Sequence, residues 1–245
     1  MNAIDFYFDN LTALLKTTLD FQKAAMDEAA RRIADCFRKG GMLYTFGTGH
    51  GHLLALEIFY RAGGMAKVCP ILDEKLMLHI SAAGSTQEER REDWVDRLLE
   101  RYPIGQNDVL IDISNSGRNA VPVLLCKAAQ ARGACVIALT SLNHSKAVTS
   151  RNSEGLRLFE IADLVLDNGG VLGDASYQAA DGAMTGPTST AVGAAILQAI
   201  VCRVKELSLE EGFEADFFKS SNVDGGDAWN DQLIAKYKDS IPGLL

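Results

Sequence analysis

Two short turns rich in glycine and polar side chains each follow a run of β-forming residues and precede a helical pattern. The first runs from Gly47 to His52 (GTGHGH) and the second from Ser114 to Asn119 (SNSGRN). Such a turn presents several backbone N–H groups at the positive end of a helix, which suits a phosphate group even without Lys or Arg. Two such turns in one chain are stronger evidence than one. The sequence therefore predicts a site for a phosphorylated ligand.

The second turn offers the larger set of hydrogen-bond donors. The apolar run from Asp108 to Ile113 is typical of a buried parallel strand, so the turn would lie at its carboxyl end, where open α/β sheets bind ligands. Its two serine hydroxyls and two asparagine amides can donate to phosphate oxygens, and its glycine lets the backbone approach closely. A simple helix N-cap is the alternative interpretation, although a cap needs only one of these groups.

Charge and composition exclude several classes of function. The chain of 245 residues has 24 Lys and Arg against 32 Asp and Glu, a net charge of −8, and 47% of its residues are hydrophobic. An acidic protein of this kind is a poor match for a general nucleic-acid surface or an anionic membrane, so we expect neither partner. An anionic ligand would have to be held locally by amides and hydroxyls.

The cysteines and the first residues indicate a cytoplasmic protein. The five cysteines are widely spaced, form no Cys-x-x-Cys pair and lie mostly in apolar runs, as expected of free thiols in a reducing compartment. The first residues do not have the pattern of a secretory signal, and no run approaches the roughly 18 apolar residues of a membrane span.

The order of the predicted elements indicates an α/β fold. Apolar residues at helical spacing predict a long N-terminal helix over residues 5–39, with Thr17 and Thr18 as a candidate break and Gly40-Gly41 as its end. Strands then alternate with helices, which predicts a three-layer αβα sandwich with a parallel sheet of about five strands. The predicted strands are 42–46, 66–72, 109–113, 134–140 and 164–166, and the predicted helices are 52–62, 88–101, 120–132 and 188–207.

We expect one domain over residues 1–245, divided into the N-terminal helix, a core over 42–207 and a C-terminal loop and helix over 208–245. Thr86 and Glu89 have capping-box spacing at the start of the helix over 88–101. The hydroxyl-rich helix start at Thr188 and Ser189 either closes the ligand site or is only a cap. The segment 168–186 has no clear assignment.

The first turn also has a rival interpretation as a dinucleotide-binding fingerprint. Gly47 and Gly49 follow a strand, and Asp73 follows the next strand, where an acid that binds ribose is expected. However, His52 stands in place of the third glycine. A nicotinamide site would also leave the second turn unexplained, so no cofactor is expected.

The order of elements and the two turns resemble the sugar isomerase (SIS) domain family over about residues 5–207. The Ser-x-Ser-Gly turn is the most specific mark of the family, and the resemblance implies that Ser114, Asn115, Ser116 and Asn119 bind phosphate. Gly51 stands where the family usually has a serine. The whole chain is most similar to phosphoheptose isomerase-like proteins, including the terminal segment from Ser220 to Asp227.

Isomerisation of a sugar needs a base, and a group that opens the ring. Glu57 lies on the helix after the first turn and could face the site, or could lie on an exposed helix face. The resemblance suggests Glu206 as a second candidate. His79, His50 and His52 could assist ring opening. A zinc set of His50, His52 and Glu57 lacks the usual spacing, so no metal is predicted.

The resemblance implies an aldose–ketose isomerase that acts on a sugar phosphate. The alternatives are a regulator that binds a phosphosugar without catalysis, and a lyase or etherase that acts on an amino-sugar phosphate. We expect a homodimer or homotetramer. The residues expected to bind the ligand are Gly47, Thr48, Gly49, His50, Gly51, His52, Ser114, Asn115, Ser116, Gly117, Asn119, Thr188 and Ser189.

Overall fold

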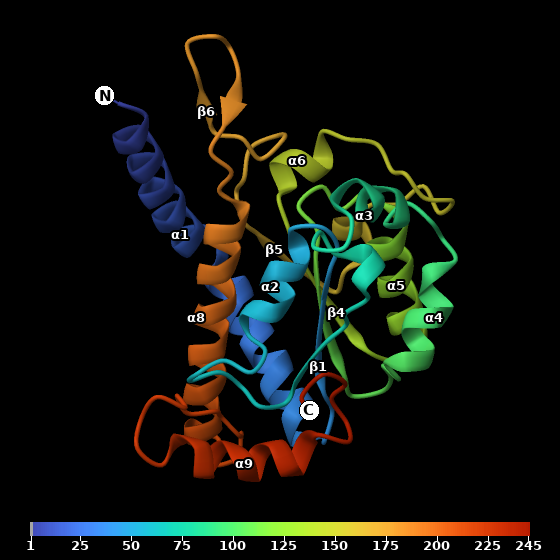
Figure 1. Cartoon of the computed structure of the whole chain (residues 1–245), viewed down its shortest axis with the longest axis vertical. Coiled ribbons are helices and arrows are strands. Elements are labelled where there is room, and N and C mark those ends of the chain that lie inside the picture. Colours follow the sequence, from blue (N-terminus) through green and yellow to red (C-terminus); the bar gives the residue numbers. More distant parts are fainter. Residues whose placement is uncertain (1) are drawn as a thin grey trace.

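Five parallel strands form the central sheet of the molecule (Figure 1), in the order β2-β1-β3-β4-β5. The computed structural model describes residues 2–245. Each strand is parallel to its neighbours, so the predicted α/β fold with a five-stranded parallel sheet is confirmed. The strands are β1 (Leu43–Gly47), β2 (Val68–Pro70), β3 (Val109–Ile113), β4 (Cys135–Thr140) and β5 (Leu164–Asp167).

Helices cover both faces of this sheet, and a separate apolar core fills the space on each side. Figure 1 shows α1, α2 and α8 on one face and α4 and α5 on the other, with α9 across the end where the strands begin. The helices on the first face are α1 (Ala3–Arg38), α2 (Gly51–Glu57) and α8 (Ser189–Glu210). Those on the second face are α4 (Trp94–Arg101), α5 (Ala120–Ala131) and the short α7 (Leu158–Ile161). The C-terminal helix is α9 (Gly226–Tyr237).

The predicted N-terminal helix is confirmed, but without the candidate break at Thr17 and Thr18. Helix α1 is continuous over 36 residues, because the segment contains no proline to remove a backbone donor and no glycine to loosen the chain. Asn2 caps its first turn by accepting a hydrogen bond from the Asp5 amide at 3.0 Å. The helix ends before Gly40, which has a φ of +82°.

The predicted helix over 88–101 is confirmed for its second part, since α4 ends at Arg101 as expected, but its start is wrong because a separate helix ends at Glu88. Helix α3 (Ala82–Glu88) begins after Ser81, whose hydroxyl accepts from the Gly84 amide at 3.1 Å. Helix α4 begins at Trp94, a fully buried side chain whose Nε1 donates to Glu88 at 3.0 Å. The turn between the helices carries Trp94 into the core. Glu89 therefore ends α3 and is not part of a capping box.

Other segments also differ from the sequence-based boundaries. Helix α2 stops at Glu57, five residues before the expected end, and Tyr60 beyond it has a φ of +46°. The unassigned segment 168–186 contains a small antiparallel hairpin, which projects beyond the sheet in Figure 1. The shorter elements are η1 (Glu74–Leu76), α6 (Leu142–Lys146), β6 (Tyr177–Gln178) and β7 (Met184–Thr185).

The position of β1 beside β3 brings the two polar turns together. Gly47 at the end of β1 is in register with Ile113 at the end of β3. From this pair the chain continues outward in opposite directions, to β2 on one side and to β4 on the other. The pair is therefore the topological switch point, where ligands bind in open parallel sheets.

One ionisable side chain is enclosed in the sheet directly before the second turn. Asp112 on β3 has no exposed surface. Its Oδ2 accepts a hydrogen bond from the Cys126 thiol at 3.3 Å, while Oδ1 has no partner within residues 2–245. Burial raises the pKa of the Asp112 carboxyl to about 7 from an ordinary value of 3.8. The folded protein therefore holds a proton on Asp112 that the unfolded chain releases above about pH 4.

This proton makes stability depend on pH. The free energy of unfolding should fall as the pH rises from 5 to 7, since only the unfolded chain gains from ionisation in that range. Asp112→Asn removes the titration, so the variant should gain about 2 kcal/mol relative to the natural protein between pH 5 and pH 8. Urea denaturation at both pH values measures this gain. Asp9→Asn, at an exposed position of α1, is the control, and a constant difference for Asp112→Asn would contradict the assignment.

Candidate functional site

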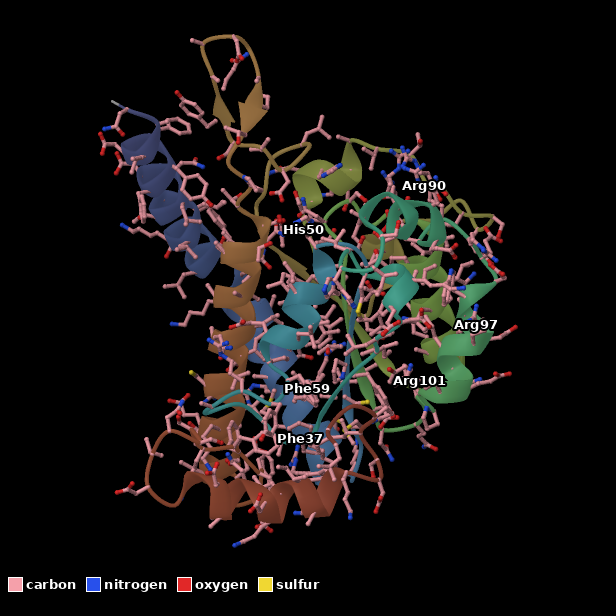
Figure 2. The ribbon with its side chains drawn as sticks, in the orientation of Figure 1. Phe37, His50, Phe59, Arg90, Arg97 and Arg101 are labelled. Atoms are coloured by element: carbon pink, nitrogen blue, oxygen red, sulfur yellow. The ribbon has the colours of Figure 1, made fainter. Side chains whose placement is uncertain are left out.

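A cavity of about 570 Å³ opens at the carboxyl ends of β1 and β3 and is lined by both polar turns. It also reaches α6, the segment before α8 and the end of α3. Figure 2 shows His50 at this end of the molecule, above the sheet. The predicted residues that line the cavity are Thr48, Gly49, His50, Gly51, Ser114, Asn115, Ser116, Asn119 and Ser189. Gly47, His52, Gly117 and Thr188 are not among its lining residues.

The second turn presents free donors to the cavity. Its shape is fixed by the Ser114 amide, which donates to the Leu139 carbonyl at 3.0 Å, and by the Gly117 amide, which donates to the Ser114 hydroxyl at 3.2 Å. Within residues 2–245, the Ser116 hydroxyl and the backbone amides of Asn115 and Ser116 have no hydrogen-bond partner. These groups surround the start of α5, where a negative charge is favoured.

The amide side chain of Asn115 is buried between this turn and the loop after β5. Its Oδ1 accepts from Asn168 Nδ2 at 3.0 Å, while its own Nδ2 is buried without a partner in the described part of the chain. A buried donor without an acceptor costs free energy. A ligand oxygen in the cavity would supply the missing acceptor.

The first turn is shaped by very close backbone contacts. A Cβ atom on Gly47 would lie 2.4 Å from the carbonyl carbon of Gly51, and a Cβ on Gly51 would lie 2.5 Å from the Ile113 carbonyl oxygen. The start of α2 therefore rests directly on the end of β3, and only glycine fits at either position. The serine that the resemblance leads us to expect at position 51 would therefore not fit here unless the backbone moved.

Gly51→Ala should consequently destabilise the fold, since its neighbour at 2.5 Å is a backbone atom that cannot rotate away. We expect a loss of roughly 2 kcal/mol or more in the free energy of unfolding, measured by chemical denaturation. Gly105→Ala is the matched control, because a Cβ there would meet nothing closer than 3.9 Å. Equal stability of the two variants would refute the close contact.

Glu89 was missed by the sequence interpretation, and it joins the two turns. Its Oε2 accepts from the Thr48 hydroxyl at 2.5 Å in the first turn, and its Oε1 accepts from Asn119 Nδ2 at 2.8 Å in the second. It also lines the cavity. Capping-box spacing assigns this carboxylate to a helix start, and no other sequence signal marks it.

The environment of Glu89 suits proton transfer. Burial raises the pKa of its carboxyl, although the Thr48 hydrogen bond and the positive charges of Arg90 and Arg151 oppose the shift. A carboxyl whose pKa moves toward neutrality can act as a general base or acid. Among the carboxylates that line the cavity, Glu89 is the one that contacts both turns.

His144 on α6 is a second lining residue that the sequence interpretation missed. Burial lowers the pKa of its imidazole, so the ring is neutral near pH 7. Its Nδ1 is buried and has no partner within residues 2–245. A neutral imidazole with a free nitrogen can exchange a proton with a sugar hydroxyl. His144 and the exposed His50 are thus the two histidines of the cavity.

The start of α8 is already occupied by a carboxylate of the chain. Asp174 accepts from the amides of Thr188 and Ser189 at 3.2 and 3.1 Å and from the Ser189 hydroxyl. These bonds satisfy donors that a phosphate would otherwise use. The hydroxyl-rich start of α8 is therefore capped internally, whereas the donors of the turn after β3 remain open to the cavity.

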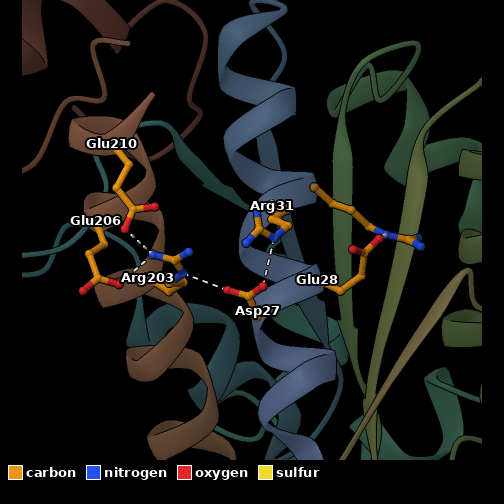
Figure 3. A network of polar contacts seen from close by, with 7 residues as sticks. Asp27, Glu28, Arg31, Arg203, Glu206 and Glu210 are labelled. Atoms are coloured by element: carbon orange, nitrogen blue, oxygen red, sulfur yellow. Dashed lines mark hydrogen bonds and ion pairs between the residues drawn. The ribbon is translucent and has the colours of Figure 1, made fainter. Parts of the chain in front are cut away.

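The three residues predicted to be catalytic lie outside the cavity lining. Glu57 pairs with Arg61 at 3.2 Å and accepts from Gln198 Nε2 at 3.1 Å. Glu206 is 65% exposed and pairs with Arg203 at 2.7 Å, in the network between α1 and α8 of Figure 3. His79 is exposed, with its ring 6.3 Å from that of His52.

Two further features bear on the predicted roles of the histidines and on metal binding. His52 is buried, and its Nδ1 lies 2.5 Å from the Gly49 carbonyl oxygen, so it supports the first turn from below. Within residues 2–245 no three His, Cys, Asp or Glu side chains are grouped as metal ligands.

Among the helices of residues 2–245, none has the length and apolar character needed to cross a membrane.

Comparison with known proteins places these features in a family. Residues 6–141 match the SIS domain. A UPF0309 protein of Geobacillus thermodenitrificans is 42% identical over 99% of this chain and 98% of its own.

Solved structures share the fold at low sequence identity. A phosphoheptose isomerase from Francisella tularensis has a TM-score of 0.57 at 15% identity, over 84% of this chain and all of its own. The NanR protein of Vibrio vulnificus, solved in complex with ManNAc-6P, has a TM-score of 0.52 at 15% identity, over 98% of this chain and 69% of its own.

Proposed function

The chain belongs to the SIS domain family, and on this basis we propose that it binds a sugar phosphate in the cavity between β1 and β3 and interconverts its aldose and ketose forms. The observation that carries the proposal is Glu89, a half-buried carboxyl that lines the cavity and accepts hydrogen bonds from both turns. A phosphate site alone would need no such group. A proton-transfer site needs one.

In this proposal the phosphate binds at the turn after β3. The Ser116 hydroxyl and the free amides of Asn115 and Ser116 donate to its oxygens, at the positive end of α5. The internal cap by Asp174 makes the start of α8 unavailable and adds a negative charge there. The phosphate is therefore held at one side of the cavity, and the sugar extends past Glu89 toward the histidines.

The proton transfer is assigned to Glu89. Ionised Glu89 removes the proton from C2 of the open-chain aldose, while a proton is added to the C1 carbonyl oxygen, which gives an enediol. Glu89 then returns its proton to C1 as the C2 hydroxyl loses its own, which gives the ketose. His144 and His50 line the same cavity and can carry the proton between the two oxygens and assist ring opening. Glu57 and Glu206, the bases expected from the sequence, have ion-pair partners away from this cavity.

A regulator that binds a phosphosugar without catalysis is the second candidate. It is favoured by the shared fold of NanR, which was solved with ManNAc-6P. Both functions need the turn after β3 to bind phosphate, but only the isomerase needs Glu89 to transfer a proton. A regulator needs Glu89 only to position the two turns.

Assembly with a second copy is part of the proposal. Helix α1 leaves large apolar side chains in solvent, including Ile4, Phe8, Leu19 and Phe21, which are 70%, 64%, 54% and 79% exposed. Exposed apolar groups gathered on one element are typical of a surface that is covered by another protein. We expect a homodimer or homotetramer that buries this part of α1.

Glu89→Gln tests the catalytic assignment. A set of pentose, hexose and heptose phosphates is first screened by thermal shift, and solvent-deuterium exchange at C2 is then followed for the ligands that bind. The glutamine side chain of this variant can keep the bonds to Thr48 and Asn119 after a flip of the Asn119 amide, so binding should persist while exchange falls about 100-fold or more. Glu57→Gln is the control and should exchange normally. Binding without exchange in the natural protein would favour the regulator.

Ser116→Ala tests the phosphate turn. Loss of one hydrogen bond to a charged group should weaken binding of the same sugar phosphate about 10-fold to 100-fold, measured by calorimetry. Ser240→Ala removes an exposed hydroxyl near the C-terminus and should bind normally. If Ser116→Ala binds as tightly as this control, the phosphate lies elsewhere.

A further inference from the structure

Three arginines that form no ion pair within residues 2–245 adjoin the cavity-lining residues Glu89 and Asn119. Arg90 follows Glu89, and Arg118 precedes Asn119. Arg151 is held next to Arg118, because its amide donates to the Arg118 carbonyl at 2.8 Å. Figure 2 shows Arg90 beside α3, at the end of the molecule that also carries His50. None of the three arginines lines the cavity itself.

The main chain around these arginines is tightly connected. The Asn152 side chain donates to the Arg118 carbonyl at 3.3 Å and to the Leu156 carbonyl at 2.9 Å. Ser153 donates to Glu92 through its amide at 2.7 Å and through its hydroxyl at 2.8 Å. The loop after α6 is thereby fastened both to the phosphate turn and to the turn between α3 and α4. These bonds fix the position of the main chain that carries the three arginines.

The cluster has one acid close by, Glu89, which interacts with Arg90 and Arg151 through its charge but forms its hydrogen bonds with Thr48 and Asn119. Within residues 2–245 none of the three guanidinium groups forms an ion pair, and Arg118 Nε is buried without a partner. Two further acids near Arg90 in the sequence are engaged elsewhere: Glu88 contacts Trp94 and Arg91, and Glu92 accepts from Ser153. The single side-chain bond in the cluster joins Arg118 Nη2 to the Thr149 hydroxyl at 3.1 Å.

The other arginines of the chain have conventional partners. They form ion pairs, lie over aromatic rings or donate to backbone carbonyls: Arg31, Arg32, Arg38, Arg61, Arg91, Arg97, Arg101, Arg132, Arg157 and Arg203. Burial, with the neighbouring positive charges of Arg151 and Arg90, lowers the pKa of Arg118. Three adjacent cations repel one another, and an acidic chain has many carboxylates with which it could have paired them. Their arrangement suits an anion that the chain itself does not supply.

We propose that Arg90, Arg118 and Arg151 form a second oxyanion site, which binds a phosphate group outside the cavity. Guanidinium groups bind phosphate oxygens through paired, charge-assisted hydrogen bonds. Arg90 and Arg151 are exposed and free to close on the ligand, while Arg118 is half-buried and fixed by Thr149. The phosphate belongs either to a separate phosphorylated molecule or to the far end of a sugar bisphosphate whose first phosphate occupies the turn after β3.

Binding of inorganic phosphate at low salt tests the site. Calorimetry is performed on the natural protein, on Ser116→Ala and on the double variant Arg90→Gln/Arg151→Gln. Phosphate binding should persist in Ser116→Ala and weaken at least tenfold in the double variant. Lys23→Gln/Arg31→Gln is the control, because it removes the same charge from exposed positions of α1. Arg90→Lys/Arg151→Lys keeps the charge without the paired geometry and should bind with intermediate affinity.

The outcomes separate this site from the proposed function. If the double variant binds phosphate as tightly as its control, if Ser116→Ala alone abolishes binding, or if the natural protein binds no phosphate, the second site is refuted. None of these results removes the sugar phosphate from the cavity. Where free phosphate binding is lost as expected, fructose 6-phosphate and fructose 1,6-bisphosphate then identify the source. A tenfold loss in the double variant for the bisphosphate but not for the monophosphate indicates the far end of a sugar, and an unchanged affinity for both sugars indicates a separate phosphorylated molecule.

Discussion

The contact between the start of α2 and the end of β3 is the constraint on which the rest of the site depends. Gly51 lies so close to the Ile113 carbonyl that no side chain fits between them, and Gly47 lies equally close to Gly51. The contact forces the first turn against the second at the switch point of the sheet. The cavity that the two turns line therefore depends on glycine at both positions.

Glu89 connects the two turns and places a carboxyl group between them. Its carboxyl accepts a hydrogen bond from Thr48 in the first turn and from Asn119 in the second, so both turns affect the same group. Asn119 is the residue before α5, and its side chain makes no cap because it is engaged by Glu89. The start of α5 is thus left open for an anion, while the start of α8 is closed by Asp174. In the proposed function, the placement of these two carboxylates leaves one end of the cavity for the phosphate and the other for proton transfer.

The sequence predicted the elements whose signals are local and strong. The strand over 109–113 has the predicted boundaries, and α1 and α5 lie within one or two residues of theirs. The glycine-rich turns that follow apolar strands indicated the switch point. This signal can be found in the sequence because each turn directly follows its strand along the chain. Gly51 was identified as a departure from its family, but its steric reason depends on Ile113, which lies far along the chain.

Glu89 and His144 could not be found in the same way. Thr86 and Glu89 satisfy the spacing of a capping box, but Glu89 lies at the end of α3, and the next helix begins at Trp94, whose burial is a tertiary effect that local spacing does not reveal. His144 lies on a helix of five residues after β4, too short for a periodic signal. The sequence suggested Glu57 and Glu206 as bases because they are carboxylates on helices. Their ion pairs with Arg61 and Arg203 could be identified only from the side-chain geometry.

The most direct test of the account is a crystal structure of the protein with the sugar phosphate that gives the largest thermal shift. The account predicts a phosphate within hydrogen-bond distance of the Ser116 hydroxyl and the Asn115 and Ser116 amides, with C1 and C2 of the sugar next to the Glu89 carboxyl. A phosphate bound at the start of α8, or a sugar whose C1 and C2 face away from Glu89, would contradict it.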